Sequence, residues 1–160
     1  MYKGIWITIC FLFLGSLCPI EAQQIAQAYD ITCGGQGKNG AYMVKVTVQV
    51  KKVEEGMEML KRCAVHGVLF RGFTGEAVGC TSQKPLVGNP EIEQTQASFF
   101  TRFFEDGIYR GYVSPVESSF TNTKLKRRLF EVSALFLVDK ERLLRYLEEN
   151  DIVKGFSDFW

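Results

Sequence analysis

The sequence has almost no excess of charge of either sign. Its 19 Lys and Arg residues stand against 18 Asp and Glu residues, which leaves a formal net charge of +1. A domain that binds nucleic acid usually has a basic balance, with its basic residues gathered on one face. Because the basic residues here are spread along the chain, we expect no nucleic acid among its partners.

The sequence is also poor in recognisable catalytic motifs. His66 is the only histidine, and the Gly-x-Ser-x-Gly motif of a hydrolase nucleophile is absent. The glycine-rich segment 34–37 precedes a predicted strand, whereas a phosphate-binding loop follows a strand and opens a helix. We therefore predict no catalytic residue, no metal and no cofactor. Paired carboxylates for glycoside hydrolysis have no fixed sequence spacing, so they stay open as an alternative.

Cys63 and His66 lie three residues apart on one face of a predicted helix. This spacing suits two ligands of a zinc site or, alternatively, a Cys–His nucleophile pair. A zinc site needs further ligands, which only Cys33, Cys80 or acidic residues brought in by the fold could supply. Because lone cysteines and histidines are common in protein cores, we favour the interpretation that both side chains line the helix–sheet interface.

The chain lacks an apolar run long enough to cross a bilayer. Its most apolar segment, residues 5–14, is short of the roughly 20 residues that a spanning helix needs. Lys3 precedes this segment and the small residue Ala22 follows it, which is the layout of a secretory signal. We expect a signal peptide over residues 1–22, a periplasmic or secreted protein, and no transmembrane helix in the mature chain. A lipid anchor on Cys18 is the alternative.

Two of the five cysteines precede the predicted cleavage site, so the mature chain keeps three. Export exposes them to conditions that permit disulfides, and three cysteines allow one bridge and one free thiol. Cys33 and Cys80 lie among glycines in predicted loops, whereas Cys63 lies in a helical pattern typical of a small buried residue. We therefore predict a disulfide between Cys33 and Cys80.

Hydrophobic periodicity predicts one α+β domain over residues 41–160, preceded by a flexible segment at 23–40. The expected elements of the domain are, in order, a half-buried strand at 41–51, a helix at 53–70, a long loop at 71–90, a helix at 92–106, an extended segment at 108–116, a polar connection at 114–126, a central strand at 129–138 and a helix at 140–149. This order suits a two-layer sandwich, with a small, mainly antiparallel sheet and helices on one face.

Three single residues are expected to shape these elements. Gly67 lies inside the first predicted helix, where it would allow a close approach to the sheet. Asp139 is placed to cap the last helix, and Asn150 to end it in the left-handed conformation.

The second predicted helix contains the candidate surface for a protein partner. Phe99, Phe100, Phe103 and Phe104 form two adjacent i, i+4 pairs, which is too broad for one narrow apolar stripe. Most of this cluster is expected to be core, and any part left exposed would mark an interface.

The candidate contact for an anion is a short basic run before the central strand. It consists of Lys124, Lys126, Arg127 and Arg128. Such a run either contacts an anionic lipid, a polysaccharide or a partner, or is a solvated strand start whose lysines protect a sheet edge.

Two blocks of the sequence carry a resemblance to known proteins. They are the valines of 44–50 followed by Cys63–Phe70, and Phe130–Val138 followed by Asp139, Leu143, Leu147 and Ile152. They are similar to uncharacterised secreted proteins of Gram-negative bacteria. Their layout also resembles the small α/β domains of flagellar assembly protein T and of accessory lipoproteins of curli-type secretion channels. The resemblance covers 41–70 and 128–155, and the chain departs from it in the loop 71–90 and in lacking a lipid-anchoring cysteine. It implies a binding or assembly module.

These features favour an exported, non-enzymatic module that binds a protein partner of the cell envelope, in assembly or secretion. The alternative is a small secreted hydrolase of cell-wall or glycan material that uses His66 or paired carboxylates. A structural protein without a ligand is the third possibility. Neither the partner nor the oligomeric state follows from the sequence.

Overall fold

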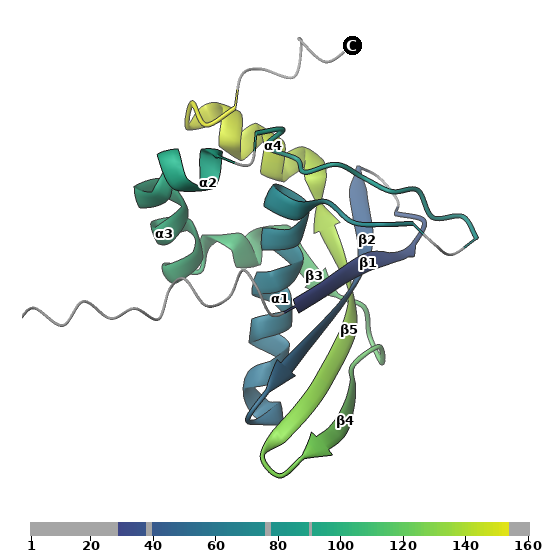
Figure 1. Ribbon diagram of the computed structural model, residues 1–160. Helices are drawn as coiled ribbons and strands as arrows, with labels where there is room; N and C mark the ends of the chain where they lie inside the picture. The colour runs from purple at the N-terminus through teal and green to yellow at the C-terminus, as the bar shows by residue number, and fades with distance from the viewer. Residues whose placement is uncertain (1–28, 38–39, 76–77, 90, 154–160) are drawn as a thin grey trace, which may run out of the picture.

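The computed structural model describes residues 29–37, 40–75, 78–89 and 91–153. In this part of the chain a mainly antiparallel, five-stranded sheet packs against helices (Figure 1). The predicted α+β class is confirmed. The predicted signal peptide at 1–22 lies outside the described residues.

The sheet is built outward from its two longest strands, which lie side by side. β2 (Ala41–Val50) pairs with β1 (Tyr29–Gly35) on one side and with β5 (Leu129–Asp139) on the other. The far edge of β5 pairs with two short strands, β3 (Val113–Pro115) and β4 (Thr121–Lys126). All of these pairs are antiparallel. β5 is therefore central, as its nearly continuous apolar sequence predicts.

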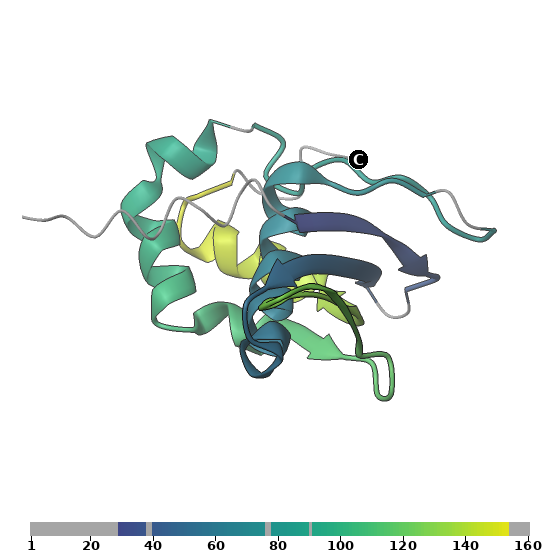
Figure 2. The same cartoon turned by 60° about the horizontal axis from the view of Figure 1, so that its bottom comes forward.

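The alternation of β2 and β5 sorts their side chains between two faces. The buried side chains are Val44, Val46, Val48 and Val50 of β2, and Val132, Ala134, Phe136 and Val138 of β5. Between them, Lys45 and Gln49 of β2 face solvent. One face of the sheet therefore forms the core, and the helices cover that face (Figures 1 and 2).

The first helix largely follows the prediction. A 3₁₀ turn at Val53–Glu55 leads into α1 (Gly56–His66), which continues as one π-helical turn, Gly67–Arg71. A Cβ atom on Gly67 would lie 2.6 Å from Ile31 Cδ1 of β1. Any larger residue at this position would force Ile31 to shift where the helix crosses β1.

The remaining helices differ in how closely they follow the prediction. The second predicted helix is broken at Gln96 into α2 (Ile92–Thr95) and α3 (Ala97–Glu105). The last helix, α4 (Lys140–Glu149), is capped as predicted, because Asp139 Oδ1 accepts a hydrogen bond from the backbone N–H of Arg142 at 3.0 Å.

Two strands were not expected from the sequence. The predicted flexible segment at 23–40 is wrong over 29–35, where β1 buries Tyr29 and Ile31 against α1 and leaves Asp30 exposed. β4 forms inside the predicted polar connection, and all of its residues are exposed. It contributes nothing to the core, so no hydrophobic period marked it.

Two local expectations also need correction. Residues Ile108–Tyr112 form a 3₁₀ helix rather than an extended segment, and only Val113–Pro115 is a strand. Asn150 has φ −104, whereas the next residue, Asp151, takes the left-handed conformation with φ 57. The stop that follows α4 therefore lies one residue later than expected.

The close approach at Gly67 makes a direct prediction. We expect Gly67→Ala to lower the free energy of unfolding by about 1–2 kcal/mol, because overpacking a core costs about 1–3 kcal/mol and exceeds the gain in helix propensity. Urea unfolding measures the change. Gly111→Ala is the matched control, since its Cβ atom meets nothing within 4 Å. An equal change in both variants would contradict the close approach.

Candidate functional site

The phenylalanines of α3 lie in the core. Phe100, Phe103 and Phe104 are 3%, 1% and 8% exposed, and Phe99 is partly buried against the same cluster. Phe99 and Phe103 contact the ring of Tyr146 in α4, at centroid distances of 5.9 and 5.8 Å. Most of the cluster is therefore core, as expected, and Phe99 is the one ring of the four that stays partly exposed beside α4.

His66 joins three elements at the end of α1. Its Nδ1 lies 2.7 Å from Tyr29 Oη of β1, and its Nε2 lies 2.9 Å from Glu93 Oε1 of α2. A carboxylate accepts hydrogen bonds, so Nε2 donates to Glu93 and Nδ1 accepts the hydroxyl proton of Tyr29. Both ring nitrogens of the neutral histidine are therefore occupied by protein partners.

The surroundings of His66 favour its neutral form. Burial lowers its pKa below 6.5, and the carboxylate of Glu93 offsets part of that effect. Arg71 and Arg62 lower the pKa further through their positive charges. At neutral pH the ring is therefore an uncharged link between β1 and α2.

Cys63 is also a core residue. It is 1% exposed, and burial raises the pKa of its thiol to about 12. The thiolate is the reactive form of cysteine, so this thiol is inert at neutral pH. The structure therefore places Cys63 and His66 in the helix–sheet interface. Among the described residues, no three His, Cys, Asp or Glu side chains gather closely enough to hold a metal ion.

A disulfide joins Cys33 of β1 to Cys80 of the long loop, with Cα atoms 5.8 Å apart. These are the two cysteines that the sequence singled out. We call residues 72–75 and 78–85 of this loop the strap. Phe73 and Gln83 exchange two backbone hydrogen bonds of 2.9 Å, and Cys33 N–H donates to Thr74 O at 2.8 Å. The two arms of the strap are thus joined to each other, and the strap is held beside β1 by the disulfide and one backbone hydrogen bond (Figure 2).

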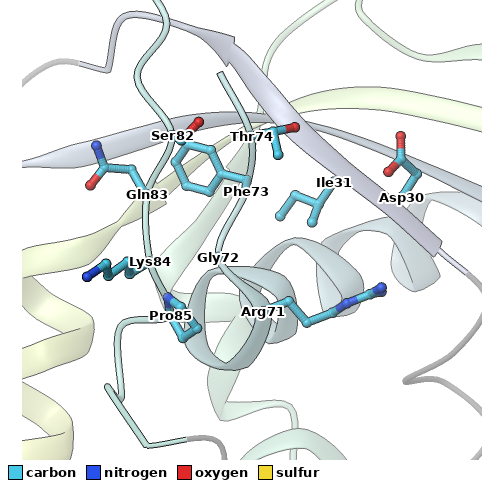
Figure 3. Close-up of a pocket in the computed structure, with 10 residues that line it drawn as sticks. All are labelled: Asp30, Ile31, Arg71, Gly72, Phe73, Thr74, Ser82, Gln83, Lys84 and Pro85. Atoms are coloured by element: carbon cyan, nitrogen blue, oxygen red, sulfur yellow. The ribbon is translucent and has the colours of Figure 1, made fainter. Parts of the chain in front are cut away.

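A shallow groove of about 580 Å³ lies between β1 and the strap (Figure 3). Ile31 and Phe73 give it apolar surface, and the hydroxyls of Thr74 and Ser82 lie along it. Arg71 lies at one end, where its guanidinium donates to Tyr29 O at 3.0 Å and stacks over the Tyr29 ring at 4.7 Å. The groove therefore combines an apolar strip with a positioned cation.

Sequence reasoning missed the groove. Its residues come from β1, from the end of α1 and from both arms of the strap, so no single segment carries a motif for it. The only signal was the unusual length and glycine content of residues 71–90, because long loops in compact domains are often functional.

The predicted basic run is gathered at one tip of the molecule. Lys124 and Lys126 lie on β4, and Arg127 and Arg128 form the turn into β5. All four are exposed. The run is contiguous in the sequence, whereas the groove is assembled from separate segments.

The chain matches no protein-family model, no curated protein and no solved structure. In the part of the chain that the structure describes, none of the helices has the length and apolar character to cross a membrane.

The disulfide should dominate the stability of the strap. Cys33 and Cys80 are 47 residues apart in the sequence, and closing a loop of that length stabilises a fold by about 4 kcal/mol in the chain-entropy model. We expect the double variant Cys33→Ser/Cys80→Ser to lose about that much free energy of unfolding. Dithiothreitol should destabilise the native chain and leave the double variant unchanged. Equal stability of the native chain with and without dithiothreitol would argue against the bridge.

His66 should make the fold sensitive to acid. Its pKa is lowered in the folded state, so the unfolded chain binds more protons, and the stabilising effect is complete only above about pH 6.5. As pH falls toward the folded pKa, the free energy of unfolding should drop by up to about 1.4 kcal/mol per pH unit. Urea unfolding of the native chain and of His66→Gln over this range isolates the effect.

Glu93→Gln supplies the second arm of this experiment. The carboxylate raises the pKa of His66, so its removal should lower that pKa and extend the acid-sensitive range downward. A variant at Glu93 with an unchanged pH profile would contradict the contact between the two side chains.

Proposed function

We propose that this protein is an exported module that binds an extended segment of a cell-envelope protein in the groove between β1 and the strap. The observation that carries the proposal is the covalent attachment of the strap by Cys33–Cys80. A rigid groove loses little conformational entropy when a ligand binds, so preformed walls favour binding of a flexible segment.

The lining of the groove supports binding rather than chemistry. The residues with the clearest catalytic potential, Cys63 and His66, lie in the core with their polar atoms buried. The groove instead presents apolar side chains, two hydroxyls and three charged side chains, which are Asp30, Arg71 and Lys84. This combination recognises shape and polarity and offers no nucleophile paired with a base. The hydrolase alternative therefore gains no support from His66.

The form of the groove favours an extended polypeptide over a compact small molecule. Its walls are two extended segments, β1 and the strap, and it is open to solvent (Figure 3). Small-molecule sites usually enclose most of their ligand, whereas extended peptides lie along the edges of sheets. Arg71 at one end would bind a carboxylate of the segment, since a guanidinium matches a carboxylate with two parallel hydrogen bonds.

Export is the second part of the proposal. The disulfide is compatible with a periplasmic or secreted protein, because such bridges persist in oxidising compartments. The signal-peptide pattern at 1–22 supports the same compartment. The resemblance to domains of flagellar and curli assembly supports a role for the partner in assembly or secretion.

The groove can be tested by blocking it. Thr74 is exposed and lines the groove, so Thr74→Arg should fill it without disturbing the core. We expect the native chain to select peptides that carry an acidic residue from a random peptide library displayed on phage. We expect Thr74→Arg to lower the affinity of those peptides at least about tenfold, which corresponds to about 1.4 kcal/mol.

Thr101→Arg is the matched control, because Thr101 is also exposed and lies on α3, outside the groove. It should bind the selected peptides as the native chain does. The proposal fails if the native chain selects no peptides, or if both arginine variants lose affinity equally.

A further inference from the structure

We propose that the hairpin formed by β4 and β5 is a second binding site, which docks the protein on a membrane surface of anionic phospholipid. The site consists of the exposed residues at the tip of the hairpin: Lys124, Leu125, Lys126, Arg127 and Arg128. It is separate from the groove, so the failure of the peptide proposal would not affect it.

The first observation is a local excess of unpaired positive charge. None of the four basic residues of the tip makes an ion pair with another described residue, and the same holds for Lys51 at the adjoining end of β2. Acidic residues are fewer at this end of the molecule. They are Glu54, Glu55, which pairs with Lys52 at 3.1 Å, and Glu131. A net positive field therefore remains at the tip, although the whole chain carries only +1.

The second observation is an exposed leucine among these charges. Leu125 is 42% exposed and lies between Lys124 and Lys126, where the register of β4 against β5 shifts. An apolar side chain flanked by cations is typical of segments that contact membranes, because the side chain enters the interface while the cations bind phosphate groups. A polysaccharide would attract the charges equally and would offer nothing to the leucine.

The third observation is the backbone of the turn. Arg128 has φ 60, in the left-handed region that glycine adopts without strain. The fold therefore holds an arginine at a position where a glycine would be more stable. Ser118 and Asp151 share this conformation, so the strain alone does not mark a site, but it makes Arg128→Gly a substitution that the fold should tolerate.

The placement of the hairpin suits contact with a flat surface. The hairpin forms the end of the molecule opposite α3 and α4, at the bottom of Figure 1. The side chains of β4 are all exposed, so the tip can approach a bilayer without unfolding any part of the core.

The test is binding of the exported protein, purified from its host, to vesicles. One preparation contains 30% phosphatidylglycerol in phosphatidylcholine, and the other contains phosphatidylcholine alone. Each basic residue near an anionic surface contributes about a fivefold gain in affinity. We therefore expect Lys126→Gln/Arg127→Gln to bind the anionic vesicles about 25-fold more weakly than the native chain, with a smaller dependence on salt.

The matched control is Arg102→Gln/Arg145→Gln, which removes the same net charge from exposed positions on α3 and α4. It should bind as the native chain does. Leu125→Ser should lose about tenfold in affinity while keeping the salt dependence, since it removes only the apolar contact.

Arg128→Gly separates a binding role from a structural one. It should raise the urea midpoint, because it relieves the left-handed arginine, and it should weaken vesicle binding about fivefold. Equal binding to neutral and anionic vesicles would overturn the proposal, as would equal losses in the two double variants. Binding to a soluble anionic polysaccharide without binding to vesicles would also overturn it.

Discussion

The pairing of β2 with β5 is the interaction on which the rest of the structure depends. Ten residues of β2 are in register with β5, and their alternate side chains meet in one buried layer. Val44, Val46, Val132 and Phe136 are each 0% exposed in this layer. Because the burial of apolar surface is the main driving force of folding, this pair sets the face that α1 must cover. β1 and the strap then extend one edge of the sheet, and β4 extends the other.

The elements that could be predicted are those that carry their own hydrophobic period. β2, α1 and α4 each present one apolar face, and β5 is apolar almost throughout, so all four were expected from the sequence. β4 could not be found this way, because its backbone pairs with β5 while its side chains stay in solvent. β1 was not predicted, because the glycines that follow Ile31 indicated a flexible loop. Most of the α3 rings were expected to be core, but not that Tyr146, more than 40 residues later, helps to cover them.

The candidate sites also differ in how far the sequence could predict them. The basic hairpin is contiguous in the sequence, so its residues could be predicted. Its position at one end of the fold could not be predicted. The groove and the His66 link are assembled from distant segments: Tyr29 and Glu93 lie 37 and 27 residues from His66. The hairpin tip and the strap occupy different ends of the ribbon in Figure 1. A protein docked through the hairpin would therefore keep its groove open to a partner.

The burial of Cys63 also protects the covalent bond of the strap. Of the cysteines in the described residues, it alone is free, and it is held in the protonated form inside the core. Disulfide exchange requires attack by a thiolate, so the folded chain cannot shuffle its own bridge. Before folding, the thiols of Cys33, Cys63 and Cys80 are equally accessible, and three different pairings among them compete. The folded core removes Cys63 from this competition, because its thiol is buried while Cys33 and Cys80 lie side by side.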